Sequence, residues 1–147
     1  MRSTIVLLIG LPGSGKSTWV ARQGAVALSS DKVREWLADD ATDQSIHAHV
    51  FATLRYLLRQ RLAIGRPVTY IDATHLIPAE RQPYAEIAAW YGCDLEAIFF
   101  DVPMDICIAR NRDRPRIVPE DAIRIMAEKL VPPSIEEGFT VIRVVRD

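Results

Sequence analysis

Residues 10–17 read Gly10-Leu11-Pro12-Gly13-Ser14-Gly15-Lys16-Ser17. The spacing satisfies the pattern Gly-x-x-x-x-Gly-Lys-Ser/Thr, which is typical of a loop that wraps backbone N–H groups around phosphate. Glycine at the first, fourth and sixth positions permits turns of the backbone that a Cβ would obstruct. A helix that begins at the end of such a loop directs its positive end toward the same phosphates. The octapeptide therefore predicts a P-loop that binds a nucleotide.

The chemistry of the side chains in this loop indicates their roles. Lys16 is expected to bridge the β- and γ-phosphates, and the Ser17 hydroxyl is expected to ligate Mg²⁺. The predicted cofactors are ATP, or another nucleoside triphosphate, and Mg²⁺. The predicted nucleotide-binding residues of the loop are Gly10, Gly13, Ser14, Gly15, Lys16, Ser17 and Thr18.

Outward from the loop, apolar β-branched runs alternate with helical patterns. The runs are continuous, as in parallel strands covered on both faces. The expected strands are Thr4–Ile9, Ala25–Leu28, Val68–Ile71, Leu95–Phe100 and Phe139–Val145. The expected helices are about 15–24, 31–38, 44–64, 78–92, 103–114 and 119–130. This alternation predicts an α/β three-layer sandwich with a five-stranded parallel sheet. Pro83 is compatible with the fourth helix only in its first turn, where N–H groups are unpaired.

The composition is that of an ordinary globular protein. With 147 residues, the chain is expected to form a single domain, residues 1–147. A net charge of −1 gives no general attraction to nucleic acid or to an anionic membrane. Cys93 and Cys107 lack the spacing of a zinc site or a disulfide scaffold. No apolar run is long enough to span a membrane or to act as a signal peptide, so a soluble cytoplasmic protein with no membrane partner is expected.

Arginine dominates the cations, with 15 arginines and 3 lysines. A planar guanidinium grips phosphate with two parallel hydrogen bonds. Four arginines occupy alternate positions of one segment, and they are Arg110, Arg112, Arg114 and Arg116. Residues 110–118 are therefore predicted to form a lid over the nucleotide, with Arg110 among its phosphate-binding arginines. A solvated charged face is the alternative interpretation of such a run.

Three charged residues follow expected strands, at the sheet edge where open α/β proteins bind ligands. Arg34 comes one helical turn after Asp31, so both side chains can face the same cleft. Asp72 ends the third strand, where an acid beside a P-loop commonly orders Mg²⁺ through water. Other interpretations stay open: Asp31 caps its helix, for which Ser29 and Ser30 are also available, Arg34 is solvated, and Asp72 only forms a turn.

Four segments carry a resemblance to a known family. They are GLPGSGKSTW at 10–19, SSDKVR at 29–34, DATH at 72–75 and ARNRDR at 109–114. In this order, and as far as about Leu130, the chain resembles the 5′-OH polynucleotide kinases. The resemblance implies a P-loop kinase fold with strand order 2-3-1-4-5. It also implies that Asp31 is the general base on the 5′-hydroxyl, that Arg34 contacts an acceptor phosphate and that Arg114 covers the donor phosphates. The sequence departs from the family at His75, where asparagine is usual.

The resemblance implies an ATP-dependent kinase that transfers the γ-phosphoryl group to the 5′-hydroxyl end of DNA or RNA, as in nucleic acid repair. The predicted catalytic residues are Lys16, Asp31, Arg34 and Arg114, and the predicted metal-binding residues are Ser17 and Asp72. The sequence contains no phosphatase or ligase motif, so a phosphatase or ligase partner would be a separate chain. Two alternatives remain: a kinase that acts on a sugar, nucleoside or antibiotic, and a module that binds ATP without transferring phosphate.

Five further positions are left open by the sequence. His75 is either functional or a surface residue. Arg55 and Arg59 lie one helical turn apart, and they either border the acceptor cleft or are solvated. His47 and His49 are two residues apart on an expected helix, so they face different sides and cannot chelate a metal together.

Overall fold

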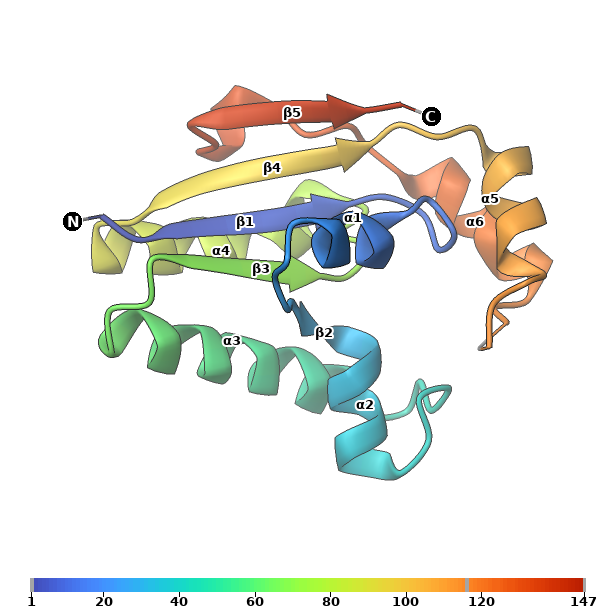
Figure 1. Ribbon diagram of the computed structural model, residues 1–147, viewed down its shortest axis with the longest axis horizontal. Coiled ribbons are helices and arrows are strands. Elements are labelled where there is room, and N and C mark those ends of the chain that lie inside the picture. The colour runs from blue at the N-terminus through green and yellow to red at the C-terminus, as the bar shows by residue number, and fades with distance from the viewer. Residues whose placement is uncertain (1, 116, 147) are drawn as a thin grey trace.

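The computed structural model describes residues 2–115 and 117–146, and its central feature is a parallel sheet (Figure 1). The strands are β1 (Thr4–Ile9), β2 (Leu28–Ser29), β3 (Val68–Asp72), β4 (Asp94–Phe100) and β5 (Val141–Val145). They lie in the order β2-β3-β1-β4-β5, and every pairing is parallel. The predicted α/β class and the strand order implied by the resemblance are confirmed. Arg116, one of the predicted lid arginines, lies outside the described residues.

Helices connect and cover the strands. They are α1 (Lys16–Arg22), α2 (Ser30–Ala38), α3 (His47–Ala63), α4 (Pro78–Tyr91), α5 (Met104–Asn111) and α6 (Glu120–Lys129), with a short 3-10 helix, η1 (Ile135–Glu137). Over the described ranges, none of these helices has the length and apolar character needed to cross a membrane.

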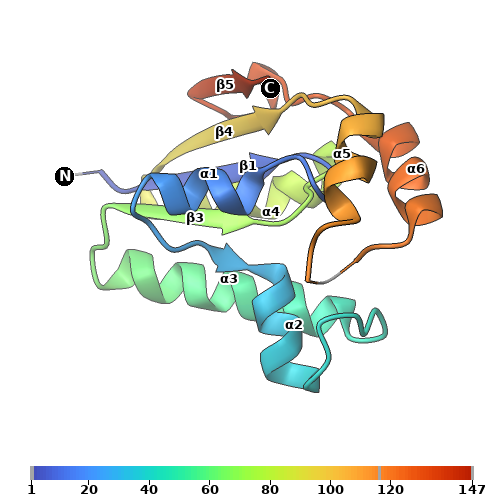
Figure 2. The same cartoon turned by 45° about the vertical axis from the view of Figure 1, so that its right-hand side comes forward.

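The central strand β1 divides the interior into two cores, because successive residues of a strand point to opposite faces. Ile5, Leu7 and Ile9 pack with residues of α3 and α4. Val6 and Leu8 pack with residues of α1 and with the opposite faces of neighbouring strands. Figures 1 and 2 show α1 in front of the sheet and α4 behind it. The predicted three-layer sandwich is therefore confirmed.

A third core closes the end of the sheet at which the strands finish. Leu11 of the P-loop is buried there together with Cys107 of α5 and Ile123 of α6. This core attaches the P-loop to the two helices that flank the predicted lid. The P-loop and the base of the predicted lid thus pack against one core.

Two strands differ from the predicted ones. β2 is Leu28–Ser29 rather than Ala25–Leu28, because this edge strand pairs only with the end of β3. β5 begins at Val141 rather than at Phe139, whose ring is buried in the core beneath α4. Apolar composition marked both segments as strands, but an apolar residue need not pair in a ladder, and Val26 is 82% exposed.

The helix α3 begins at His47, three residues later than the predicted Gln44. The Asp43 carboxylate accepts hydrogen bonds from the backbone N–H and the hydroxyl of Ser45, at 2.9 and 2.6 Å. Such a local bond holds the backbone in a turn and competes with helix formation. The side chain of Asp43 therefore delays the helix.

Pro83 lies in the second turn of α4, so the expectation that it must fall in the first turn is wrong. Proline has no N–H to donate to the carbonyl of Ala79, four residues earlier. Ala79 is exposed, so water can hydrogen-bond to this carbonyl instead. The helix continues past the proline to Tyr91.

Candidate active site

The P-loop joins β1 to α1 and lies against the backbone of α5. A Cβ placed on Gly13 would lie 2.4 Å from the carbonyl oxygen of Cys107, and the residue has a φ of +83°. Packing and backbone conformation therefore both require glycine at this position. Gly15, with a φ of 101°, is the N-cap of α1 and directs the start of that helix toward the loop.

Not every predicted loop residue reaches the cleft. The cleft is lined by Gly13, Gly15, Lys16, Ser17 and Thr18. Gly10 and Ser14 do not line it, and their N–H groups donate within the protein, to the carbonyls of Thr74 and Leu11 at 3.1 Å each. The Ser14 hydroxyl is buried and has no hydrogen-bond partner within the described ranges. Gly10 and Ser14 therefore stabilise the conformation of the loop and do not face the cleft.

Lys16 holds its ammonium group at the mouth of the loop. Nζ donates to the carbonyls of Gly10 and Leu11, at 2.9 Å each. Burial lowers the pKa of Lys16 from its ordinary value, the charge of Asp72 raises it, and the charge of Arg114 lowers it further. Lys16 and Arg114 both line the cleft, so the two cations lie on the same cavity.

Ser17 and Asp72, the two predicted metal-binding residues, are in direct contact. The Ser17 hydroxyl donates to the Asp72 carboxylate at 2.6 Å. Both groups offer hard oxygen ligands, the kind that Mg²⁺ prefers, and Mg²⁺ usually takes one or two protein oxygens together with substrate phosphates and water. Within the described ranges, no cluster of three His, Cys, Asp or Glu residues could hold a metal by itself. The pair therefore fits an Mg²⁺ ion that is shared with nucleotide phosphates.

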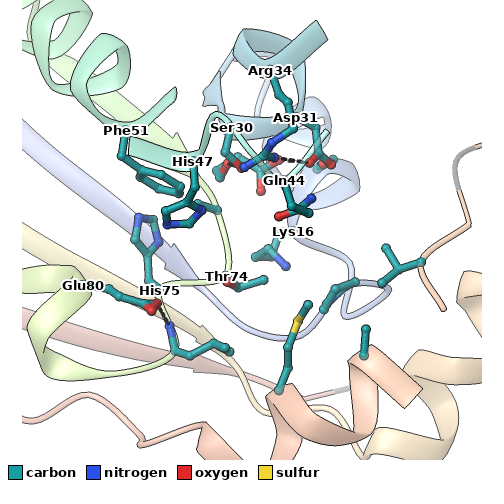
Figure 3. Close-up of a pocket in the computed structure, with 18 of the residues that line it drawn as sticks. Lys16, Ser30, Asp31, Arg34, Gln44, His47, Phe51, Thr74, His75 and Glu80 are labelled. Carbon is teal, nitrogen blue, oxygen red and sulfur yellow. Dashed lines mark hydrogen bonds and ion pairs between the residues drawn. The ribbon is translucent and has the colours of Figure 1, made fainter. Parts of the chain in front are cut away.

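Asp31 lies in the first turn of α2, where it faces the cleft. Ser29 is the N-cap of this helix, since its side chain accepts from the N–H of Lys32 at 3.3 Å. Capping is therefore not the role of Asp31. Its carboxylate forms an ion pair with Arg34 at 3.6 Å, as Figure 3 shows.

Arg34 is buried, with only 4% of its surface exposed, so the alternative interpretation of a solvated residue is wrong. It lines the cleft beside Asp31. Its Nε has no hydrogen-bond partner within the described ranges. A buried guanidinium with a spare donor is a ready site for an anion, because unpaired buried polar groups are costly.

The arginine-rich segment begins at the end of α5 and passes over the cleft. Arg110 and Arg114 line the cleft, whereas Arg112 forms an exposed ion pair with Glu120 at 2.7 Å. Asn111 is fully buried and pins the far side of the segment: its amide donates to the carbonyl of Val118 at 2.6 Å and accepts from the N–H of Val118 at 3.0 Å. Among the described arginines of this segment, Arg110 and Arg114 thus face the cleft and Arg112 faces solvent.

All four predicted catalytic residues line one cleft of about 1230 Å³. Figure 3 shows three of them, Lys16, Asp31 and Arg34. The cleft continues beyond the phosphate site between α3, α4 and α6. Arg55 lines this extension and Arg59 does not, which separates two residues that the sequence treated alike.

Two residues of this extension were missed or left open by the sequence. His75 is buried, with a φ of +49°, and Tyr84 of α4 packs edge-on against its ring, with centroids 5.5 Å apart. The His75 Nε2 and the Tyr84 hydroxyl lack hydrogen-bond partners within the described ranges. For His75, the sequence offered one sign of a special role, namely that asparagine is usual at this position in the family it resembles. For Tyr84, the sequence offered no such sign.

Arg81 of α4 fixes the loop that carries His75. It donates to the carbonyls of His75 and Leu76, at 2.9 and 3.1 Å, and also to that of Val131. Its ion pair with Glu137 spans 3.0 Å, and the arginine is almost fully buried. This residue therefore ties the end of β3 to the connection between α6 and β5.

A five-stranded parallel sheet in this order, with a P-loop after the central strand, defines the P-loop kinase fold, which binds nucleotides. Residues 5–133 match the family described as the AAA domain. The chain therefore belongs to the AAA domain family. This match does not separate the 5′-OH polynucleotide kinases from other kinases of the fold, so that part of the resemblance stays a prediction.

Several known proteins are similar to the chain. The L-seryl-tRNA(Sec) kinase of Methanococcus maripaludis is 24% identical over 144 residues, which cover 92% of this chain and 55% of that enzyme. A sugar kinase from Janibacter sp. superimposes with a TM-score of 0.70 at 16% identity, covering 99% of this chain and 86% of the other. A chain of the Pnkp1/Rnl/Hen1 complex superimposes with a TM-score of 0.61 at 22% identity, covering 80% and 40%. The chain spans about half or less of the length of the curated relatives that it matches.

Proposed function

We propose that this chain transfers the γ-phosphoryl group of ATP to the 5′-hydroxyl end of a nucleic acid. The observation that carries the proposal is the ion pair between the buried Arg34 and the partly exposed Asp31, which lines the same cleft as Lys16 and the Ser17–Asp72 contact. In the proposal, Asp31 is the proton acceptor and Arg34 the anion-binding cation, and both lie in the same cleft as the P-loop.

In the proposed reaction, the Asp31 carboxylate takes the proton of the acceptor hydroxyl as the new O–P bond forms. The bond between the γ-phosphorus and the β,γ-bridging oxygen breaks, and ADP leaves with the electron pair. Lys16 and Arg114 stabilise the negative charge on the transferring group. Bound Mg²⁺, held by Ser17 and Asp72, would supply further positive charge to the phosphate oxygens. The reaction depends on positioning and electrostatics, which these groups provide.

Arg34 favours a nucleic acid acceptor. An uncharged small substrate would offer no partner to a buried guanidinium, whereas the phosphate after the 5′-terminal nucleoside would pair with it. The L-seryl-tRNA(Sec) kinase is named for a substrate carried on tRNA, which supports an acceptor that is part of a nucleic acid. A phosphatase or ligase on a separate chain remains part of the proposal.

A small-molecule kinase is the second candidate. The similarity to a sugar kinase over 99% of this chain supports it, because that protein shares the whole fold. A module that binds ATP without transfer is less favoured, since Asp31 and the lid arginines would then have no task.

Incubation with γ-labelled ATP separates the candidates. We expect label to appear on 5′-OH DNA or RNA oligonucleotides and not on oligonucleotides that already carry a 5′-phosphate. Lys16→Ala is the matched inactive control, with a loss of about 10²–10³ in rate. Transfer to a panel of sugars and nucleosides, with none to oligonucleotides, would establish the small-molecule function instead. Binding of ATP with no transfer to any acceptor would establish the binding module.

A further inference from the structure

A group of rings lies in the cleft opposite the lid. His47 and Phe51, one turn apart on α3, have ring centroids 4.6 Å apart at an angle of 40°. Both line the cleft, as does His75 from the end of β3. Figure 3 shows the three rings on one side of the cleft, apart from Asp31 and Arg34. This aromatic wall, defined as His47, Phe51 and His75, has no part in the proposed phosphoryl transfer.

His75 presents a hydrogen-bond acceptor on this wall. Its Nδ1 lies 2.6 Å from the carbonyl oxygen of Leu8, and a carbonyl can only accept, so Nδ1 carries the hydrogen. Burial lowers the pKa of His75 to about 4, so the ring is neutral near pH 7. Nε2 therefore bears a lone pair, and it has no partner within the described ranges although the residue is 2% exposed.

The Tyr84 hydroxyl, next to this ring, is also buried without a partner in the part of the chain that the structure describes. Buried polar groups in proteins are nearly always paired, and exceptions commonly mark the place of a ligand or an ordered water. An acceptor nitrogen beside stacked rings suits a flat molecule that carries an N–H group.

We propose that the aromatic wall binds the 5′-terminal nucleobase of the acceptor, with the base stacked on His47 and Phe51 and one N–H of the base donating to His75 Nε2. This inference rests on the proposed function. Under this proposal, three parts of the acceptor end bind to three different groups. The 5′-hydroxyl binds at Asp31, the following phosphate at Arg34 and the base at the aromatic wall. Stacking tolerates any base, because each base has a π-face.

The first test removes the base. Wild-type kcat/KM is measured on oligonucleotides with a normal or an abasic 5′-terminal residue. We expect a preference for the normal terminus of about tenfold or more, from the usual strength of stacking on aromatic side chains. Phe51→Leu, which keeps an apolar side chain at a half-buried site, is expected to lose most of this preference. Tyr56→Leu is the control, because Tyr56 is an exposed aromatic of the same helix that does not line the cleft.

The second test removes the N–H. N3-methylthymidine stacks like thymidine but lacks its only N–H donor, so we expect slower transfer when it stands at the 5′ end. The same base placed at the second position is the control.

The outcomes separate this inference from the proposed function. Equal rates on abasic and normal termini would show that the aromatic wall does not bind the terminal base. The proposed 5′-hydroxyl kinase activity would still stand. A Phe51→Leu effect on the KM for ATP alone would assign the wall to the donor base and overturn the inference. Absence of transfer to every oligonucleotide would remove the proposed function itself.

Discussion

Asp31 and Asp72 lie at the ends of neighbouring strands, yet their surroundings differ. Asp72 accepts from the Ser17 hydroxyl, whereas Asp31 pairs with Arg34. These different contacts support the proposed separate roles, a proton acceptor for Asp31 and a metal organiser for Asp72.

Exchange of each carboxylate for an amide tests these roles. Asp31→Asn should reduce acceptor-dependent transfer by about 10²–10⁴ and leave ATP binding unchanged, because an amide cannot take the proton. Asp72→Asn should raise the Mg²⁺ concentration needed for half-maximal rate. A Mg²⁺ titration of both variants checks this, and identical titration curves would contradict the separate assignments.

Arg34 decides between a nucleic acid and a small acceptor. Arg34→Met, which keeps the apolar stem in its buried site, should lower kcat/KM on a 5′-OH oligonucleotide by roughly 1.5–3 kcal/mol, the worth of a hydrogen bond to a charged group. The loss should shrink on a nucleoside without a 3′-phosphate. Measurement of both enzymes on both acceptors forms a double-mutant cycle with the phosphate as partner.

Arg59→Ala is the matched control for that cycle, since Arg59 is a cation of α3 that does not line the cleft. It should leave both acceptors unaffected. An equal loss on both acceptors in Arg34→Met would show that Arg34 serves the fold or the ATP site.

At the scale of elements, the predicted lid is held at one end by α5 and at the other by the bonds of Asn111 to Val118. Several residues between them line the cleft or face solvent, and few are buried. Such a segment can move locally without disturbing the three cores.

Hydrogen exchange tests the lid. Residues 110–118 should exchange more slowly when ATP and Mg²⁺ are added. Asn111→Leu should speed exchange in this segment, because it leaves the buried N–H and carbonyl of Val118 unpaired at a cost of about 1–3 kcal/mol each. Glu120→Gln, which weakens only the exposed pair with Arg112, should have a much smaller effect. Exchange that is insensitive to nucleotide would count against a lid.

At the scale of the whole molecule, His75 couples the centre of the sheet to the cleft. The ring bonds to Leu8 of β1, packs on Tyr84 of α4 and sits in the loop that Arg81 fixes. Burial keeps its pKa near 4, below the value of about 6.5 in an unfolded chain.

This shift predicts a pH dependence of stability. Between pH 6.5 and 4, His75 is protonated in the unfolded chain but stays neutral in the folded chain. The free energy of unfolding therefore falls as the pH falls through this window. By pH 4 the loss from this one group should be about 3 kcal/mol. His75→Asn, which tolerates the positive φ, should flatten this part of the curve of unfolding free energy against pH. His49→Asn, at an exposed site of α3, should not, and equal flattening by both would contradict the assignment.

The sequence by itself determined the architecture and the phosphate end of the site. The P-loop spacing, the apolar runs and the glycine and proline boundaries are local signals, and they specified the α/β class, while the strand order came through the resemblance. Asp31 and Asp72 were found because the carboxyl ends of parallel strands meet at one sheet edge, whereas Arg114 was found through the arginine-rich run and the resemblance. The sequence could not tell that Ser29 caps α2, that Arg34 is buried or that Pro83 is tolerated in a second turn.

Tertiary structure alone decided which side chains share the cleft beyond the phosphates. His75 and Tyr84 are far apart from His47 and Phe51 along the chain, and no local pattern relates them. They share the cleft because α3 and α4 both pack their apolar side chains against β1, and this packing joins residues that are distant in the sequence. Arg55 and Arg59 lie one helical turn apart on α3. Only the way in which α3 packs in the molecule places Arg55 at the cleft and Arg59 outside it.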